Sequence, residues 1–187
     1  MHLILLGAPG SGKGTQGSLL AEHFGAQHIS SGQLLRAHLG DATAFGKRIE
    51  DYVRTGELVP DEVVLELLRP AVTAAVADGG YVLDGFPRTL RQAELAFREA
   101  VPMGATADAV VYLAVPDEIV RQRLAGRSEG RVDDGSSEVT ERRLRIFHAE
   151  TEPLLDYYRS RGLLVTIDAA GPAEEVTAAT IAALEAR

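Results

Sequence analysis

Short runs of apolar residues alternate along the chain with segments in which apolar residues recur at helical spacing. Four runs are almost wholly apolar, and Gln27–Ile29 is a fifth, weaker candidate; the four are Leu3–Leu6, Tyr81–Leu83, Ala109–Ala114 and Leu163–Ile167. Such short apolar runs are typical of strands that are buried on both faces, as in a parallel sheet. The pattern therefore predicts a five-stranded parallel sheet with its strands well separated in sequence.

Helices are predicted between these runs, where apolar positions recur every three to four residues. Their expected ranges are Gly12–Phe24, a helix capped by Ser30 or Ser31, about Ala42–Tyr52, a helix that begins after Pro60, Leu90–Ala100, Asp117–Ala125, Glu138–Ser160 and Ala173–Ala186. Strands that alternate with helices predict an α/β fold of three layers, α-β-α, with helices on both faces of the sheet. One segment, Gly126–Ser137, has almost no apolar residues and is either a surface loop or a mobile flap.

The composition narrows the class of protein. The 187 residues suit one domain, and 45% of them are hydrophobic, but no apolar run approaches the roughly 20 residues needed to cross a bilayer. There is no cysteine, which excludes disulfides and thiolate zinc sites. The net charge of −8 argues against general nucleic-acid binding. We expect a cytoplasmic protein that associates with neither membrane nor nucleic acid.

The stretch "GAPGSGKGT", from Gly7 to Thr15, follows a predicted strand and opens a predicted helix. In that context its glycines let backbone N–H groups turn around a phosphate chain, next to the positive end of the helix. Lys13 is one of only two lysines in the chain and adds a point charge for the outer phosphates. Gly14 stands where Ser or Thr usually follows the lysine, and Thr15 comes one residue later. The stretch predicts binding of a nucleoside triphosphate; the alternative is a glycine-rich turn without a ligand.

The stretch "LDGFPRT", from Leu83 to Thr89, ends the second clear strand. A carboxylate at the carboxyl end of a strand, here Asp84, can hold Mg²⁺ through water, although it could instead only cap the turn. Arg88, just beyond it, can clamp a phosphate with two hydrogen bonds, unless it is an ordinary surface arginine.

Together with "ISSGQLLR", "TGELVPDE", "VPDEIVRQRLAGR" and "TERRL", these stretches resemble the adenylate kinase family in order and close to its spacing. The resemblance implies a P-loop nucleoside monophosphate kinase fold and the reaction ATP + AMP ⇌ 2 ADP with Mg²⁺. By resemblance, the residues that bind ATP are Gly10, Ser11, Gly12, Lys13, Gly14, Thr15, Arg127 and Gly171. Those that bind AMP are Ser31, Arg36, Glu57, Leu58, Val59, Gly85, Phe86, Pro87, Arg88, Gln92, Arg131 and Arg143. Those that act on the transferring group are Lys13, Arg88, Arg123, Arg131 and Arg143.

The same resemblance implies a division into parts and a set of partners. The core would comprise 1–29, 60–126 and 138–187, with an AMP-binding insert at 30–59 and a short lid at 127–137. The lid lacks cysteine and resembles the short-lid form, so we expect no structural zinc. Asp133 and Asp134 resemble paired acids near the lid hinge, with a solvated loop as the equal alternative. The partners would be ATP, AMP and ADP, and the protein would act as a monomer.

Three alternatives remain at this point. A UMP/CMP or GMP kinase shares the phosphate chemistry and differs in the acceptor pocket; Gln92, whose amide both donates and accepts, favours adenine. A GTPase switch would need an asparagine-containing guanine loop, and the chain contains no asparagine. An inactive P-loop regulator is disfavoured because Lys13, Asp84, Arg88 and Arg143 are all present.

Overall fold

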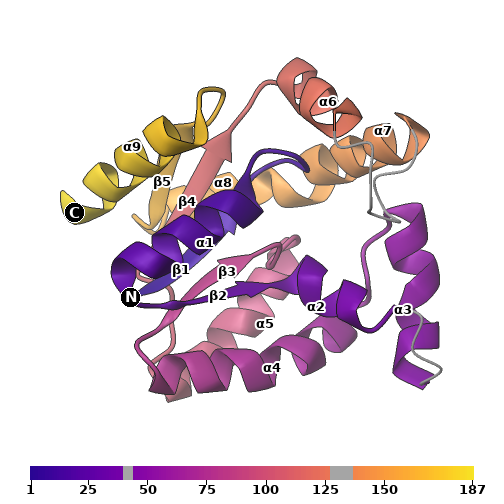
Figure 1. Cartoon of the computed structure of the whole chain (residues 1–187). Coiled ribbons are helices and arrows are strands. Elements are labelled where there is room, and N and C mark those ends of the chain that lie inside the picture. Colours follow the sequence, from indigo (N-terminus) through magenta and orange to yellow (C-terminus); the bar gives the residue numbers. More distant parts are fainter. Residues whose placement is uncertain (40–43, 127–136) are drawn as a thin grey trace.

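The protein is described by a computed structural model, which covers residues 1–39, 44–126 and 137–187. Within these residues, five parallel strands form one sheet in the order β2-β3-β1-β4-β5 (Figure 1). The strands are β1 (His2–Leu6), β2 (Gln27–Ser30), β3 (Tyr81–Asp84), β4 (Ala109–Ala114) and β5 (Leu164–Asp168). Among the described residues, we find no helix with the length and apolar character that crossing a membrane requires.

Helices cover both faces of this sheet. They are α1 (Lys13–Phe24), α2 (Ser31–Ala37), α3 (Ala44–Thr55), α4 (Asp61–Ala77), α5 (Leu90–Ala100), α6 (Asp117–Ala125), α7 (Ser137–Ile146), α8 (Pro153–Arg159) and α9 (Ala173–Glu185), with a 3-10 turn η1 (Val101–Met103) and a π turn η2 (Phe147–Thr151). Helices α1 and α9 pack on one face, whereas α4, α5 and α8 pack on the other. Helices α2 and α3 extend to one side beyond the end of β2 (Figure 1).

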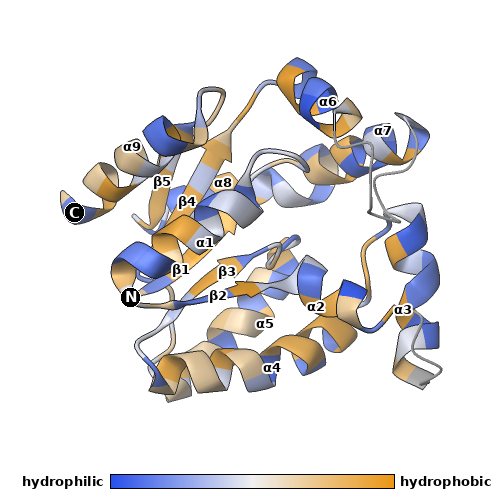
Figure 2. Ribbon diagram, in the orientation of Figure 1, coloured by the Kyte–Doolittle hydropathy of each residue, from blue (hydrophilic) through white to orange (hydrophobic). Residues whose placement is uncertain are grey.

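The alternation of side chains along β1 explains why both faces need a cover. Leu3 and Leu5 point to the face that carries α1 and α9, whereas Ile4 and Leu6 point to the opposite face, and all four are buried. Successive side chains of a strand point to opposite faces, so a wholly apolar strand is stable only in the middle of three layers. Figure 2 shows hydrophobic colours on the strands between the helices, and blue, hydrophilic segments on parts of α1, α3, α6 and α7.

The strands and most helices lie where the apolar pattern predicts them, but a single helix over Glu138–Ser160 is wrong. The chain there forms α7, the π turn η2 and then α8. Pro153 has no N–H, so the regular helical bond at this point is missing. Instead, Glu152 N donates to Phe147 O at 2.9 Å, which closes the wider turn. The ring of His148 in this turn lies between Asp117 of α6 and Glu152, with ring N–carboxylate distances of 3.0 and 2.9 Å.

Candidate functional site

The loop between β1 and α1 has backbone angles that favour glycine. Gly10 has φ of 79° and Gly12 φ of 99°, in the left-handed region that other residues rarely adopt. A Cβ atom at Gly10 would also lie 3.0 Å from Cγ of Leu124. Because the loop leads straight into α1, its N–H groups lie at the positive end of the helix dipole. The loop therefore has the geometry of an anion-binding turn.

Lys13, the first residue of α1, folds its side chain back over this loop. Its Nζ donates to Gly7 O at 2.7 Å and to Ala8 O at 2.9 Å. The hydroxyl of Ser11 is buried, and within the described residues it has no hydrogen-bond partner. The ammonium and the hydroxyl add two donors to the backbone N–H groups, which suits a chain of phosphates.

A cavity of about 390 Å³ opens beside the loop, at the carboxyl ends of β1 and β3. These two strands are neighbours in the sheet, and β4 pairs with β1 on its other side. Ligands of open α/β sheets bind in the crevice at such carboxyl ends. Positive charge predominates in the lining, which includes Lys13, Arg36, Arg88, Arg143 and the carboxylate Asp84. We call this the loop cavity.

Asp84 is buried at the end of β3, with 8% of its surface exposed. Ser30, which lies opposite it on β2, donates from its hydroxyl to Asp84 Oδ2 at 3.3 Å. A Cβ atom at Gly14 would lie 4.0 Å from the same carboxylate oxygen, so Asp84 lies close to the start of α1. The pairing of β1 with β3 thus places this carboxylate next to the predicted phosphate loop.

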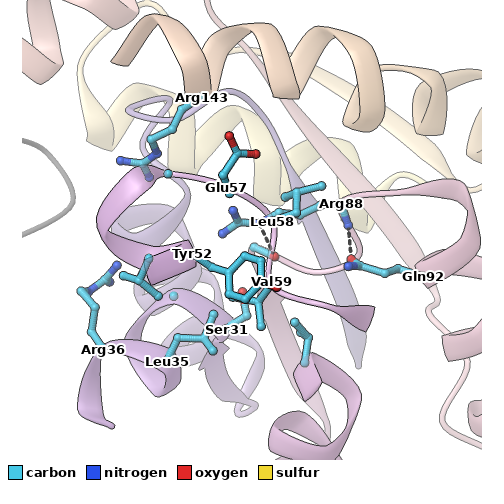
Figure 3. A pocket seen from close by; sticks show the side chains of 15 residues that line it. Ser31, Leu35, Arg36, Tyr52, Glu57, Leu58, Val59, Arg88, Gln92 and Arg143 are labelled. Carbon is cyan, nitrogen blue, oxygen red and sulfur yellow. Dashed lines mark hydrogen bonds between the residues drawn. The ribbon is translucent and has the colours of Figure 1, made fainter. Parts of the chain in front are cut away.

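A second cavity, of about 60 Å³, adjoins the first and is lined by α2, α3 and the loops after α3 and β3 (Figure 3). We call it the insert cavity. Its lining includes the predicted residues Ser31, Arg36, Glu57, Leu58, Val59, Gly85, Arg88, Gln92 and Arg143. Five of these also line the loop cavity, namely Leu58, Gly85 and the three arginines Arg36, Arg88 and Arg143. The tertiary structure therefore brings guanidinium groups from three separate segments to the place where the two cavities meet.

Ser31 and Gly85 are in close contact in the insert cavity. The hydroxyl of Ser31 is buried without a hydrogen-bond partner within the described residues. Gly85 has φ of 79°, and a Cβ atom there would lie only 2.5 Å from Ser31 Oγ. Because glycine has no Cβ, the hydroxyl of Ser31 can occupy this space, where it can donate a hydrogen bond to a ligand oxygen.

Gln92 is a buried residue, with 2% of its surface exposed, which excludes a solvated helix position. Its Oε1 accepts a hydrogen bond from Arg88 N at 2.7 Å (Figure 3), and its Nε2 donates to Asp61 Oδ1 at 2.8 Å. The carbonyl of Arg88 accepts a hydrogen bond from Thr151 of the π turn at 2.8 Å, and Arg88 Nε donates to Gly85 O at 2.8 Å. The segment with Arg88 is thus fixed from three sides.

Arg123 does not line either cavity. Its Nη2 donates to the carbonyls of Ala169 and Ala170, both at 2.9 Å, in the loop that contains Gly171. Gln16, on α1, holds the end of the same loop because its Nε2 donates to Ala173 O at 2.9 Å. Arg123 and Gln16 therefore fix the segment that contains Gly171, which the resemblance predicts to contact ATP.

Helix α1 packs closely on β2 at Gly17. A Cβ atom there would lie 2.3 Å from Nε2 of His28, so the ring occupies the space of a side chain. Nδ1 of His28 lies 3.1 Å from the hydroxyl of Ser18. Burial lowers the pKa of His28, while the nearby Asp84 raises it. The net direction favours a neutral ring beside the loop cavity.

Some predicted residues cannot be placed, and some residues of the site were not predicted. Arg127, Arg131, Asp133 and Asp134 lie outside the described residues. Four residues with contacts in or behind the site were missed, namely Gln16, Tyr52, Asp61 and Thr151. Gln16 directly follows the phosphate-loop motif, and Asp61 was interpreted only as part of a helix start. Nothing in the sequence pattern marks Tyr52 or Thr151 as neighbours of this site.

The sequence model of adenylate kinases matches residues 5–163 of the chain. The chain belongs to the adenylate kinase family. An adenylate kinase from Streptomyces avermitilis is 40% identical over 214 aligned residues, which cover 99% of this chain and 97% of that protein. The adenylate kinase of Rhodococcus erythropolis is 42% identical, covering 98% and 99%, and that of Corynebacterium urealyticum is 41% identical, covering 99% of each.

Membership in the adenylate kinase family confirms two predictions. One is the resemblance itself, and the other is the fold class, an α/β P-loop nucleoside monophosphate kinase with a five-stranded parallel sheet. Adenylate kinases are ATP:AMP phosphotransferases, so the enzyme class and the predicted function, adenylate kinase rather than a UMP/CMP kinase, are confirmed as well. The roles of the individual site residues and the division into core, insert and lid stay predictions.

Proposed function

We propose that the two adjoining cavities catalyse the reversible transfer of a phosphoryl group from Mg-ATP to AMP, giving two ADP. The observation that carries this proposal is the set of arginines shared by both cavities, Arg36, Arg88 and Arg143. One cavity is lined by the phosphate loop and the other by the insert, so two phosphate chains would meet at these cations. Two polyanions repel each other, and phosphoryl transfer depends mainly on positioning and on neutralising this charge.

In this proposal ATP binds along Gly10–Thr15, and Lys13 stabilises the phosphoryl group in transit. AMP binds in the insert cavity, with its phosphate at Arg36 and Arg88. The transfer breaks the bond from the γ-phosphorus to its bridging oxygen, whose electron pair leaves with ADP, and forms a bond to an AMP phosphate oxygen. That oxygen is already anionic near neutral pH, because the second pKa of a phosphate monoester is about 6. No general base is therefore required.

Mg²⁺ would be held at Asp84, through water, and near the hydroxyl of Thr15. Both residues line the loop cavity, and both offer the hard oxygen ligands that Mg²⁺ prefers. Within the described residues, no three His, Cys, Asp or Glu side chains are grouped as a metal site. A single buried carboxylate suits an ion that keeps most of its water ligands. When bound, the ion would neutralise charge on the ATP phosphates.

We assign 1–29, 60–126 and 138–187 to the core, 30–59 to the AMP-binding insert and 127–137 to a lid. Helix α7 begins at Ser137, one residue before the proposed core segment. We also propose a cytoplasmic monomer whose partners are nucleotides, without nucleic acid, a membrane or structural zinc. The net charge of −8 supports the exclusion of nucleic acid.

A panel of acceptors tests the substrate class: ATP is the donor, and AMP, CMP, UMP and GMP are offered separately. We expect transfer to AMP to be strongly preferred, and a preference for CMP or UMP would replace the proposal by a pyrimidine nucleotide kinase.

The variant Arg88→Ala tests the placement of the AMP phosphate at Arg88. It should raise the KM for AMP and lower kcat, while ATP binding by calorimetry stays nearly unchanged. Arg98→Ala, an exposed arginine on α5, is the matched control. Loss of ATP affinity alone in Arg88→Ala would contradict the placement.

A further inference from the structure

A third cavity, of about 320 Å³, lies away from the phosphate loop, between the sheet and the helices α4, α5 and α8. It is far larger than a packing defect, and its volume falls at the lower end of the range of about 300–1,000 Å³ found for small-molecule sites. It is separated from the insert cavity by the loop after β3, whose Phe86 and Pro87 form part of its wall. We call it the aromatic cavity.

The lining of the aromatic cavity is mostly apolar and rich in rings, with Tyr81, Phe86, Phe97, Tyr157 and Tyr158. Two large apolar residues that line it are exposed, Phe97 to 54% and Met103 to 39%. Large apolar side chains left in water at the edge of an apolar cavity are typical of a binding site rather than of a sealed core. The lining therefore suits a flat apolar body.

The cavity also has polar groups that lack an acidic partner. Tyr158 is only 6% exposed, and within the described parts of the chain its hydroxyl makes no hydrogen bond; the oxygen is not among the described buried atoms that lack a partner, so it keeps contact with solvent. By contrast, the hydroxyl of Tyr81 donates to Ala105 O at 2.7 Å. Tyr158 is thus a donor that faces the lining of this cavity without an acceptor.

Arg161 supplies a second such group. Its guanidinium lies 3.5 Å from the ring centre of Tyr157 and donates to Tyr157 O at 2.8 Å, but no carboxylate of the described residues pairs with it. The other arginine of the lining, Arg69, is paired with Glu99 through two hydrogen bonds. Burial raises the pKa of Tyr158 and outweighs the opposite effect of Arg161, so the phenol keeps its proton and can donate it in a hydrogen bond. The charged groups of the lining therefore carry one net positive charge, on the exposed guanidinium of Arg161.

We propose that the aromatic cavity binds a small amphipathic carboxylate. The apolar body lies among the rings, and the carboxylate accepts hydrogen bonds from the hydroxyl of Tyr158 and from Arg161. A carboxylate has two oxygens and can accept a hydrogen bond from each donor. Hydrogen bonds to ionised groups are also about twice as strong as neutral ones. An uncharged apolar ligand would leave the guanidinium without a counter-charge. This site is distinct from the nucleotide cavities and does not depend on the proposed reaction.

The test uses 2-naphthoate as the probe, titrated into the full chain by calorimetry in the presence of saturating AMP. The uncharged analogue 2-naphthalenemethanol has the same ring system and serves as the comparison. We expect one molecule of naphthoate to bind with a Kd of about 1 mM or tighter, and the alcohol to bind at least ~10-fold more weakly. Absence of naphthoate binding, or equal affinity for the two compounds, would overturn the proposal.

Three variants and one control variant locate the binding site. Tyr158→Phe and Arg161→Met should each weaken naphthoate about 5–10-fold and leave the alcohol unchanged. The control Arg159→Met, at the end of α8 and paired with Asp156, should change neither. Ala96→Phe, which fills the cavity from α5, should abolish binding of both compounds. If that variant does not fold, the two donor variants still decide the question. Unchanged naphthoate affinity in both donor variants would overturn the proposal.

Discussion

The hydrogen bond from Gln92 to Asp61 allows a quantitative prediction for Asp61→Ala. Gln92 is almost fully buried, and its Nε2 donates to Asp61 Oδ1 at 2.8 Å. Removing the acceptor leaves a buried amide N–H without a partner, which costs about 1–3 kcal/mol. Asp61 also lies in the first turn of α4, where a negative charge contributes about 0.3–1 kcal/mol through the helix dipole. We expect Asp61→Ala to lower the free energy of unfolding by about 2–3 kcal/mol.

The neighbouring Glu62→Ala is a matched control. Glu62 also lies in the first turn of α4, and it pairs with Arg91, as Asp61 does. Its side chain is 70% exposed, so this ion pair contributes little, and the dipole contribution is common to both residues. We therefore expect Glu62→Ala to cost about 0.5 kcal/mol. The difference between the two variants isolates the bond to Gln92, at about 1.5–2.5 kcal/mol.

The assay is urea unfolding with equal m-values, checked by the melting temperature. For a chain of this size about 2–4 °C corresponds to 1 kcal/mol, so Asp61→Ala should melt about 4–12 °C lower than the parent protein. Asp61→Asn keeps an acceptor oxygen and should recover most of the loss. The KM for AMP should rise in Asp61→Ala and stay unchanged in Glu62→Ala, because only the former releases Gln92. If Asp61→Ala and Glu62→Ala agree within about 0.5 kcal/mol, the bond does not stabilise the fold as we argue.

Three further predictions concern the loop, the α1–β2 contact and the π turn. Lys13→Met should keep its circular dichroism but turn over at least ~10²-fold more slowly, and near-normal kcat would refute its role. Gly17→Ala should destabilise the parent protein by about 1–2 kcal/mol, because its Cβ would overlap the ring of His28. In a His28→Ala background Gly17→Ala should instead stabilise the protein by about 0.5–1 kcal/mol, because alanine has the higher helix propensity. If Gly17→Ala changes the free energy of unfolding in the same direction in both backgrounds, the overlap with His28 is ruled out. The hydrogen bond to Glu152 raises the pKa of His148 in the folded protein. The protonated ring therefore stabilises the fold fully at pH values below the ordinary histidine pKa of about 6.5, and this stabilisation is lost as the pH rises through the raised pKa. The difference in melting temperature between the parent protein and His148→Gln should therefore become smaller from pH 5.5 to pH 8.5. A difference that grows over this range would contradict the stabilisation by protonated His148.

Features that depend on neighbours in the chain could be predicted from the sequence. The apolar runs predicted the strands to within one or two residues, since burial on both faces demands apolar residues at successive positions. Gly25, just beyond the last apolar position of α1, predicted the end of that helix, and it adopts the left-handed conformation. The phosphate loop was predicted for the same reason, because strand, glycine turn and helix follow one another directly.

The tertiary structure alone decided which distant residues meet. The pairing of β1 with β3 brings Asp84 beside the phosphate loop, and the packing of the insert and α7 brings Arg36 and Arg143 to Arg88. Gln92 was predicted from the resemblance as an AMP-binding residue, and only packing showed that it is buried and bonded to Asp61. Local propensities say nothing about such pairs, because their stability comes from burial and hydrogen bonds between segments far apart in the chain. These contacts exist only once the layers have packed together, and they decide where the charges of the site converge.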